Sequence, residues 1–566
     1  MSSVFDYDGI VRESYESARS LATQALLMSQ QKTTIAALGV GTLYFMTASL
    51  VTRKPSTITI TSPKDVVQYG VGGAVATFLS TFVWTPKVTE IRVTQSMLRS
   101  LPRGVGNLSL ITTIDVSGNR ITALPMEIGR LKRLETLNVS NNCLVGLPST
   151  LGSLTSLVSL NAMGNEIESL DGVCLPGSLR VLGLKDNNLT ELPEDFFTGL
   201  VHLEQLYLTG NRLVALPDSI CDCHSLVKVQ ASHNALKHLP ERLGSLENLE
   251  LLRVACCEIA AIPDSLIDAQ SLSWLSIAGN PCCGTRLSQV KNATRIISEK
   301  DIQMGKKLGD GASGEVFEAE YRKKKVAYKI FRKDEVSPDG HCQDEIQIAC
   351  MMHDENLARV LARVDGGDDF AQGVIMEFVD GTPLAEKPNG ESLLRCRWKP
   401  GQLFSISFVL KCLSSVAGGL HHMHSRCIAH GDVYAHNVLA RQDGVSILCD
   451  YGASFTYTRN NKNNRMFELQ EVRAFGILVK DLIERIDISF LDMEVAIDCQ
   501  KQLLLIAQQC LSIHPMRRPM FADLHRKLKT LEKAASSSGR TPRSDSRFWL
   551  QRKDDSGSER SVQTAR

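Results

Sequence analysis

The sequence of 566 residues lacks an excess of charge of either sign. Lys and Arg together number 63, Asp and Glu together number 62, and the formal net charge is +1. A chain balanced in this way has no overall field that would draw it to nucleic acid. The composition therefore predicts no nucleic-acid partner.

The sequence also lacks a cysteine framework and a cleavable leader. Its 16 cysteines are scattered from Cys143 to Cys510 without a repeated spacing, and the close pairs among them do not have the spacing of a zinc site. Reduced thiols in a reducing compartment are the simplest explanation. Residues 1–32 have a helix-like pattern of mixed charge, and their acidic side chains argue against a signal or transit peptide.

Two runs without charged residues follow this first segment. They are Thr33–Thr52 and Val66–Pro86, each long enough to span a bilayer and each flanked by Lys or Arg. The pair predicts an N-terminal helical, transmembrane hairpin over residues 33–87. Thr, Ser and Gly dilute both runs, so a pair of buried helices in a soluble domain is the alternative.

From residue 88 to residue 283 the chain repeats with a period of about 23 residues. Each unit combines a Leu-Pro pair, an Asn and a short strand such as Leu134–Val139, whose leucines point inward while the Asn bonds neighbouring backbone. The pattern resembles the leucine-rich-repeat family in its short Leu-Pro form, which implies an α/β solenoid. Cys257 stands in the Asn position of one unit. The other Asn positions are 119, 142, 165, 187, 211, 234 and 280.

The strand residues between the inward leucines face out on the concave side of such a solenoid. They are mostly small or neutral polar residues, and a face of this kind suits a protein partner. A solenoid that only acts as a spacer is the alternative. Examples of these residues are Thr113, Asp115, Thr136, Asn138, Ser159, Asn161, Gln205, Tyr207, Lys228, Gln230 and Arg253.

The stretch that begins at His430 contains the candidate catalytic residues. Asp432 lies five residues before Asn437 and eighteen before Asp450, which is followed by Tyr451 and Gly452. This spacing places a base and two oxygen ligands for a metal on adjacent loops. Phosphoryl transfer requires these residue types, because the transferred group needs its charge neutralised and the attacking hydroxyl oriented.

Further motifs resemble the protein kinase family, near its tyrosine-kinase-like class, and imply a bilobal α+β fold that uses ATP and Mg2+. A G-x-G-x-x-G-x-V loop precedes Val326-Ala-Tyr-Lys329, and the resemblance pairs Lys329 with Glu345, or with Asp344 one residue earlier. It makes Asp432, Lys329 and Asn437 catalytic and Asn437 and Asp450 metal ligands. It assigns nucleotide binding to Leu308, Gly309, Asp310, Gly311, Ala312, Ser313, Gly314, Val316, Ala327, Lys329, Glu345, the gatekeeper Met376, and Glu377 and Val379 of the hinge.

Three departures from the family pattern limit what it implies. Gly431 replaces the Arg that would read a phosphate on the activation segment, so control by such a phosphate is not expected. Tyr434 stands where serine/threonine kinases keep a Lys, which predicts slow turnover. Glu471 follows Asp450 by only 21 positions, so the platform for a peptide substrate must be short, with Glu468 as a candidate partner of Arg518.

The sequence thus predicts a multidomain chain. We expect an N-terminal helical segment (1–32), the membrane hairpin (33–87), leucine-rich repeats (88–283), a linker (284–300), a kinase domain (301–533) and a disordered tail (534–566). The linker is too polar to cross a membrane, so repeats and kinase are expected to face the cytoplasm together. The predicted function is transfer of phosphate from ATP to Ser or Thr of proteins. A pseudokinase scaffold and a small-molecule phosphotransferase are the alternatives.

Overall fold

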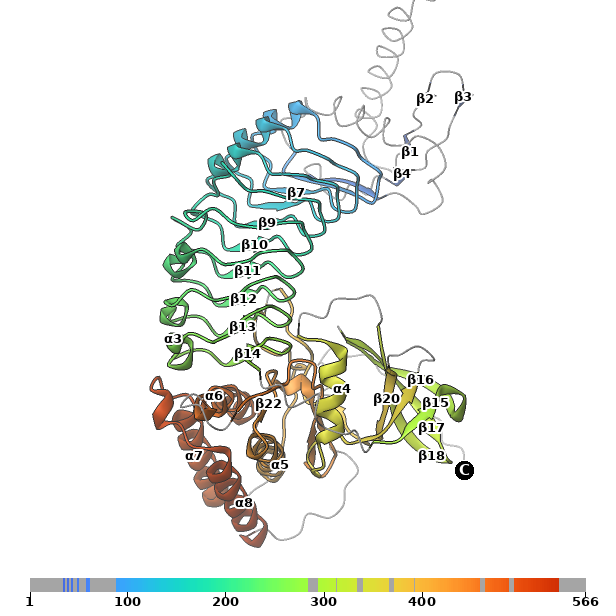
Figure 1. Ribbon diagram of the computed structural model, residues 1–566, viewed down its shortest axis with the longest axis vertical. Helices are drawn as coiled ribbons and strands as arrows, with labels where there is room; N and C mark the ends of the chain where they lie inside the picture. The colour runs from blue at the N-terminus through green and yellow to red at the C-terminus, as the bar shows by residue number, and fades with distance from the viewer. Residues whose placement is uncertain are drawn as a thin grey trace, which may run out of the picture. The chain divides into compact units, whose positions relative to one another are not determined.

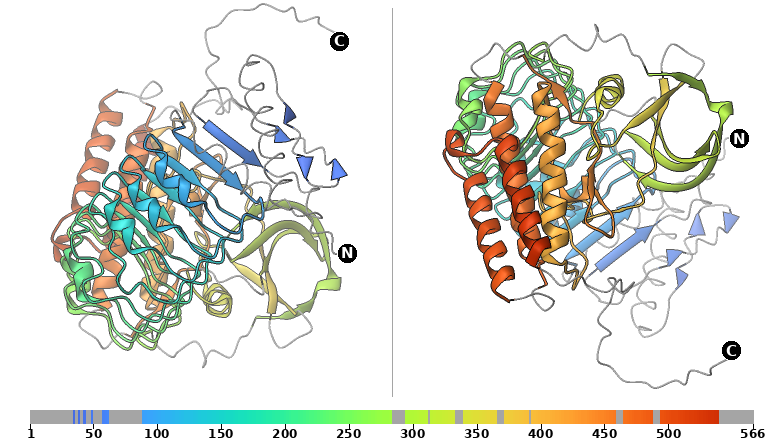
Figure 2. Two further views of the ribbon diagram at one scale, coloured as in Figure 1. Left: turned by 90° about the horizontal axis from the view of Figure 1, so that it is seen from above. Right: turned by 90° about the horizontal axis from the view of Figure 1, so that it is seen from below.

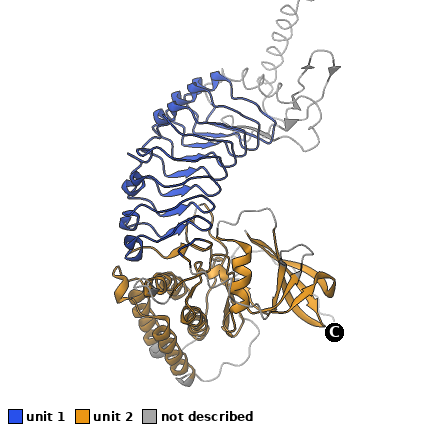
Figure 3. Ribbon diagram, viewed as in Figure 1, with its two compact units in different colours: residues 1–269, 280–282 blue, residues 270–279, 283–566 orange. Residues whose placement is uncertain are grey.

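The computed structural model describes residues 88–283, 294–311, 313–332, 339–365, 371–390, 392–458, 464–487 and 493–538, together with five short strands between residues 34 and 61. The chain forms two compact units (Figure 3). The first comprises Met1–Ala269 and Asn280–Cys282, and the second comprises Gln270–Gly279 and Cys283–Arg566.

The first unit is a stack of short parallel strands (Figure 1). The middle residue of each three-residue strand is buried and at least one neighbour is partly exposed. The leucine pattern therefore supplies one continuous core. The strands, in chain order and sheet order alike, are β5 (Thr57–Thr61), β6 (Glu90–Thr94), β7 (Thr113–Asp115), β8 (Thr136–Asn138), β9 (Ser159–Asn161), β10 (Val181–Gly183), β11 (Gln205–Tyr207), β12 (Lys228–Gln230) and β13 (Leu251–Arg253).

The Leu-Pro pairs begin the helical turns of the solenoid. Pro102, Pro125 and Pro148 each occupy the position before a 3₁₀ helix, with φ near the value that the proline ring imposes. The turns are η2 (Arg103–Asn107), η3 (Met126–Arg130), η4 (Ser149–Ser153), η5 (Asp218–Asp222), η6 (Leu243–Ser245) and the α-helical turn α3 (Asp264–Ile267).

The repeated Asn side chains hold neighbouring repeats together, as the sequence predicted. Asn165 donates to the carbonyls of Val139 and Ala162 at 3.1 and 2.9 Å and accepts from the amide of Leu144 at 3.0 Å. Cys257 takes the same position with a weaker contact, 3.5 Å from its sulfur to the carbonyl of Ala231. The ladder satisfies backbone groups that the turns leave without partners.

The predicted membrane localisation was wrong, and the structure does not support the membrane hairpin over residues 33–87 or the membrane partner that went with it. No helix in the described part of the chain is long and apolar enough to cross a bilayer. Within the first run the structure instead has short antiparallel strand pairs, β1 (Thr34–Ile35) with β4 (Ala48–Ser49) and β2 (Leu38–Gly39) with β3 (Thr42–Leu43). The Thr and Gly residues that dilute this run favour extended or turn backbone over helix. The second run lies outside the described residues.

The second unit contains a six-stranded sheet, and one helix, α4 (Cys342–Met351), packs against one face of it. One face of the sheet forms a core from Val326, Tyr328 and Ile375, and the other packs Phe331 and Val374 against Ile346 of α4. In sheet order the strands are β15 (Ile296–Ser298), β19 (Val360–Asp365), β20 (Ala371–Glu377), β18 (Lys324–Phe331), β17 (Gly314–Tyr321) and β16 (Ile302–Asp310).

The rest of the second unit is mainly helical. Figures 1 and 2 show its long helices beside one another, apart from the six-stranded sheet. The residues before the catalytic loop form α5 (Ile406–Ser425), and the Ser405 hydroxyl caps this helix by accepting from the amide of Phe408. The other elements are α6 (Asn464–Ile483), α7 (Met493–Cys510), α8 (Phe521–Ser538), β21 (Thr382–Pro383), β22 (Ile428–Ala429), β23 (Val438–Ala440), β24 (Ser446–Leu448), β25 (Phe455–Thr456) and, from the repeat pattern, β14 (Trp274–Ser276).

Candidate active site

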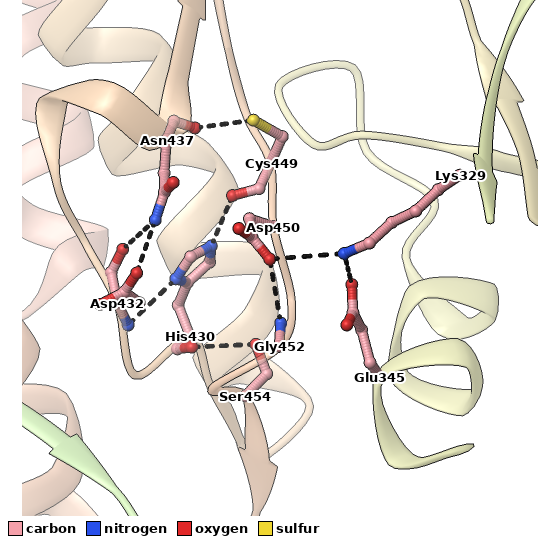
Figure 4. A network of polar contacts seen from close by, with 9 residues as sticks. All are labelled: Lys329, Glu345, His430, Asp432, Asn437, Cys449, Asp450, Gly452 and Ser454. Carbon is pink, nitrogen blue, oxygen red and sulfur yellow. Dashed lines mark hydrogen bonds and ion pairs between the residues drawn. The ribbon is translucent and has the colours of Figure 1, made fainter. Parts of the chain in front are cut away.

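Lys329 and Glu345 form a buried ion pair between the sheet and α4 (Figure 4). Lys329 is the sixth residue of β18, and Glu345 lies in the first turn of α4. Both side chains are at most 10% exposed. Of the two carboxylates that the sequence offered, Glu345 is therefore the partner of Lys329, rather than Asp344.

Asp450 joins this pair from the other lobe of the unit. Its Oδ1 lies 3.6 Å from Nζ of Lys329. Burial acts to raise the pKa of Asp450, but the ammonium groups of Lys329 and Lys387 outweigh it and lower that pKa to about 2. Burial likewise opposes the charged form of Lys329, yet Glu345 and Asp450 raise the pKa of the ammonium above its usual value. The site therefore holds a fixed cation between two carboxylates.

The catalytic loop follows β22 and brings Asp432 and Asn437 together. The Asn437 amide donates to Oδ2 of Asp432 at 2.8 Å and to the Asp432 carbonyl at 2.9 Å. His430 braces the loop, because one ring nitrogen lies 3.3 Å from the carbonyl of Cys449 and the other 3.3 Å from the amide of Asp432 (Figure 4). Asp432, Asn437 and Asp450 thus lie on adjacent loops, as the spacing predicted.

The glycine-rich loop is the turn between β16 and β17. The Gly311 amide donates to the Gly314 carbonyl at 2.9 Å. A side chain at Gly314 would place its Cβ 2.1 Å from the carbonyl oxygen of Ile330, so only Gly fits there. Asp310 is held at the end of β16 by Lys307 at 2.7 Å and by Arg332. Ala312 lies outside the described residues, and Ser313 follows it in the turn.

Four predicted nucleotide residues share one face of the sheet. Strand register pairs Val316 with Lys329 and Ala327 with Met376, and side chains alternate along each strand. Val316, Ala327, Lys329 and Met376 therefore point to the side on which α4 packs. Val316, Ala327 and Met376 are only partly buried, which leaves apolar surface for a flat ring. Leu308 and Gly309 lie at the end of β16, Glu377 ends β20, and Val379 follows it.

The donor atoms at the junction of the two loops fit a hard cation. Asn437 uses its amide nitrogen toward Asp432, which turns its amide oxygen away from that residue. Asp450 stands in the left-handed backbone region, at φ 69°, and its carboxylate is held charged. One amide oxygen and one carboxylate suit Mg2+, which keeps further water or phosphate ligands in its octahedral shell.

A buried network behind the catalytic loop was missed by sequence reasoning. Gly431 adopts φ 79°, and its amide donates to Oε1 of Glu471 on α6. The other oxygen of Glu471 lies 2.7 Å from Nε2 of His424, whose Nδ1 lies 2.9 Å from the Tyr457 hydroxyl. Burial opposes the charge of Glu471, but the contacts from His424 and Gly431 lower its pKa below the usual value. Gly at position 431 therefore allows the left-handed backbone that brings this amide to Glu471.

The short activation segment packs most of its hydroxyl groups inward, with one exception. Ser454 donates to the His430 carbonyl at 2.9 Å, and Thr456 and Tyr457 are also buried, whereas Thr458 is exposed. Glu468 does not take the predicted role at Arg518, because its Oε1 accepts from the amide of Phe521 at 2.8 Å. Arg518 itself donates to backbone carbonyls.

Comparisons with known proteins identify two kinds of domain in this chain. Residues 302–475 match the family described as protein kinase domain. Residues 177–236 match the leucine rich repeat family, and residues 90–175 match a leucine-rich repeat region.

Individual protein kinases are similar to part of this chain. The chain is 24% identical over 287 residues to the megakaryocyte-associated tyrosine-protein kinase of Rattus norvegicus, covering 44% of this chain and 58% of that protein. It is 23% identical over 316 residues to a probable serine/threonine-protein kinase of Dictyostelium discoideum, covering 43% of this chain and 40% of that protein. The chain thus spans about half the length of these curated relatives.

Among solved structures, a leucine-rich-repeat protein of Leptospira interrogans is similar to 34% of this chain. The match covers 56% of that protein at 26% sequence identity, with a TM-score of 0.32.

Proposed function

Since this chain is a leucine-rich-repeat-containing protein kinase by its domains, we propose that it transfers the γ-phosphate of ATP to Ser or Thr hydroxyls of protein substrates. The observation that carries the proposal is the cluster of Lys329, Glu345 and Asp450 across from the bonded pair Asp432 and Asn437. Protein kinases need these five groups together.

Each residue has a defined task in this proposal. Lys329, fixed by Glu345, binds the α and β phosphates of ATP, and the amides of the glycine-rich loop cover the phosphates. Asp450 and Asn437 hold Mg2+, which neutralises charge on the phosphates during transfer. Asp432 orients the attacking hydroxyl and accepts its proton.

The position of Tyr434 sets the expected speed. A Lys there would face the γ-phosphate, and loss of one such donor typically lowers the rate by about 10²–10³. Positioning and metal binding supply most of the remaining acceleration. We therefore propose a slow but active enzyme.

The repeats are proposed to bind a protein through the strand face that carries Gln205, Tyr207, Lys228 and Gln230. All four lie at flanking positions of β11 and β12, and the partly exposed ones among them offer both hydrogen-bonding groups and an aromatic ring. A face of this composition suits a polar protein surface.

An acceptor assay tests the proposed function. The full chain is incubated with Mg2+ and γ-labelled ATP in the presence of a mixed protein acceptor or of small alcohols and aminoglycosides, and labelled amino acids are then identified. Label on phosphoserine and phosphothreonine supports the proposal. Label only on phosphotyrosine or only on small molecules refutes it, and binding of ATP without any transfer favours a scaffold.

A further inference from the structure

Trp274 comes from the repeat pattern but lies against the catalytic loop of its own unit. Its indole ring stacks on Tyr434, with ring centroids 4.3 Å apart and planes inclined by 4°. Its Nε1 donates to the carbonyl of Val433 at 3.0 Å. These contacts hold the two residues that directly follow Asp432, and Trp274 is only 2% exposed.

The strand that carries Trp274 differs from the other repeat strands. All three residues of β14 are buried, whereas every other three-residue strand of the repeats keeps a partly exposed neighbour beside its inward residue. Leu275 is the inward residue, so Trp274 and Ser276 occupy the positions that form the concave face elsewhere. Ser276 donates to the carbonyl of Asp339 at 2.8 Å. Both outer positions of β14 are thus used within the second unit.

Two arginines also bind this segment: the partly buried Arg473 of α6, and the buried Arg518, which follows the turn Pro515–Arg517. Arg518 donates to the Gln270 carbonyl at 2.6 Å as well as to Leu469 and Ser512. Arg473 donates to the Ser271 carbonyl at 3.0 Å. Burial lowers the pKa of Arg518 to about 10. Among the described residues no carboxylate pairs with this guanidinium, and the three carbonyl contacts offset part of the cost of burying its charge. The segment Gln270–Gly279 is therefore anchored at its first two residues and at its centre.

We propose that Trp274 is a positioning residue for phosphate transfer, which holds Asp432 in place through its stack on Tyr434 and its hydrogen bond to Val433. The segment Gln270–Gly279 then belongs to the catalytic machinery and supports the loop where the activation segment is too short to do so. The proposal rests on the proposed function. It also gives Tyr434 a task, because a Lys at this position would lose the aromatic stack.

The expected effect follows from the geometry. The stack and the hydrogen bond of Trp274 are both made with the catalytic loop, whereas ATP binding relies on Lys329 and the glycine-rich loop, so the loss of Trp274 should leave ATP binding intact. A shift of about 1 Å in the catalytic loop is enough to lower the transfer rate by roughly 10²-fold. Trp274→Ala should therefore lower kcat by about tenfold or more and change the KM for ATP by less than about threefold.

The test compares full-length variants by transfer kinetics and by hydrogen exchange of the peptide that contains residues 430–438. Trp274→Ala should accelerate exchange in this peptide and lower kcat, whereas Trp274→Phe, which keeps an aromatic face, should restore most of both. Trp398→Ala is the matched control, because Trp398 packs on Phe404 and under Arg485 in the same unit. It should destabilise the unit without accelerating exchange of the catalytic loop.

A double variant tests whether the effect of Trp274 on kcat passes through Tyr434. If Trp274 acts through Tyr434, Trp274→Ala combined with Tyr434→Ala should lower kcat by less than the product of the two single effects. The proposal is overturned if Trp274→Ala leaves kcat and exchange unchanged, or if Trp398→Ala affects both equally. A wild-type chain that transfers no phosphate refutes the proposed function instead, and the exchange measurement then decides the positioning role alone.

Discussion

Gly431 stands where the kinase pattern has an Arg, which suggests a lost function, but the backbone conformation at this position requires a Gly. Its φ of 79° lies in the left-handed region, and an added Cβ would lie 2.3 Å from the Ala453 carbonyl oxygen. Sequence comparison alone registers only the missing Arg. The structure shows that this position lets the loop approach the activation segment while its amide reaches Glu471.

Replacement of Gly431 should therefore destabilise the second unit. We expect Gly431→Ala to lower the free energy of unfolding by about 1–3 kcal/mol, because left-handed backbone and a close oxygen both oppose a side chain. Chemical denaturation of the full chain measures the change. Gly390→Ala is the control, since a Cβ there meets nothing within 4 Å. Equal stability of the two variants would contradict this explanation.

Glu471 should make stability depend on pH in the acid range. Glu471→Gln should cost about 1.5–3 kcal/mol at neutral pH, because contacts to a charged group are lost. Since folding lowers the pKa of Glu471, its contribution is fully present above the unfolded pKa of about 4.3 and is lost as pH falls through the folded pKa. Denaturation curves of both proteins should therefore converge as the pH falls below about 4. A constant difference down to the acid limit would rule out the charged form.

At the scale of single elements, the Asn ladder explains why the repeats need that residue. The Asn165 side chain bonds four backbone groups that belong to two neighbouring repeats, at 2.9–3.3 Å. Asn165→Ala should lower the free energy of unfolding of the first unit by about 1–3 kcal/mol, because buried backbone groups lose their partners. The exposed Asn107 provides the control, and Asn107→Ala should change stability by less than about 0.5 kcal/mol. If both substitutions have the same effect, the ladder is not the source of stability.

The activation segment gives a second prediction at this scale. From the sequence, control of this segment by a phosphate was not expected, but the Ser454 hydroxyl has a structural role, because Ser454 is 1% exposed and donates to the His430 carbonyl. Ser454→Ala should cost about 1 kcal/mol of stability and slow transfer, whereas Thr458→Ala, at an exposed site, should change neither. Parallel unfolding and transfer measurements decide this. A large loss of activity in Thr458→Ala would show that a phosphate at this position is read by another basic group.

Across the whole molecule, the features that could be predicted from the sequence are those marked by residues at regular or fixed spacing. The repeat period, the Asn ladder and the set Lys329, Asp432, Asn437 and Asp450 all follow from short motifs with a physical reason for each residue. The first N-terminal run was misjudged, because its uncharged length was given more weight than its content of Thr and Gly. The role of β14 could not be foreseen, since Trp274 fits the repeat pattern and its partners lie about 160 residues away in sequence.

The central claim is that the second unit catalyses phosphate transfer although it lacks a Lys at position 434. The most direct measurement is a single turnover of the full chain with bound ATP and Mg2+, comparing the wild type with Asp432→Asn. We expect the wild type to transfer label to Ser or Thr, while Asp432→Asn binds ATP with similar affinity and transfers at least about 10²-fold more slowly. Equal transfer by both proteins, or none by either despite ATP binding, would contradict the claim.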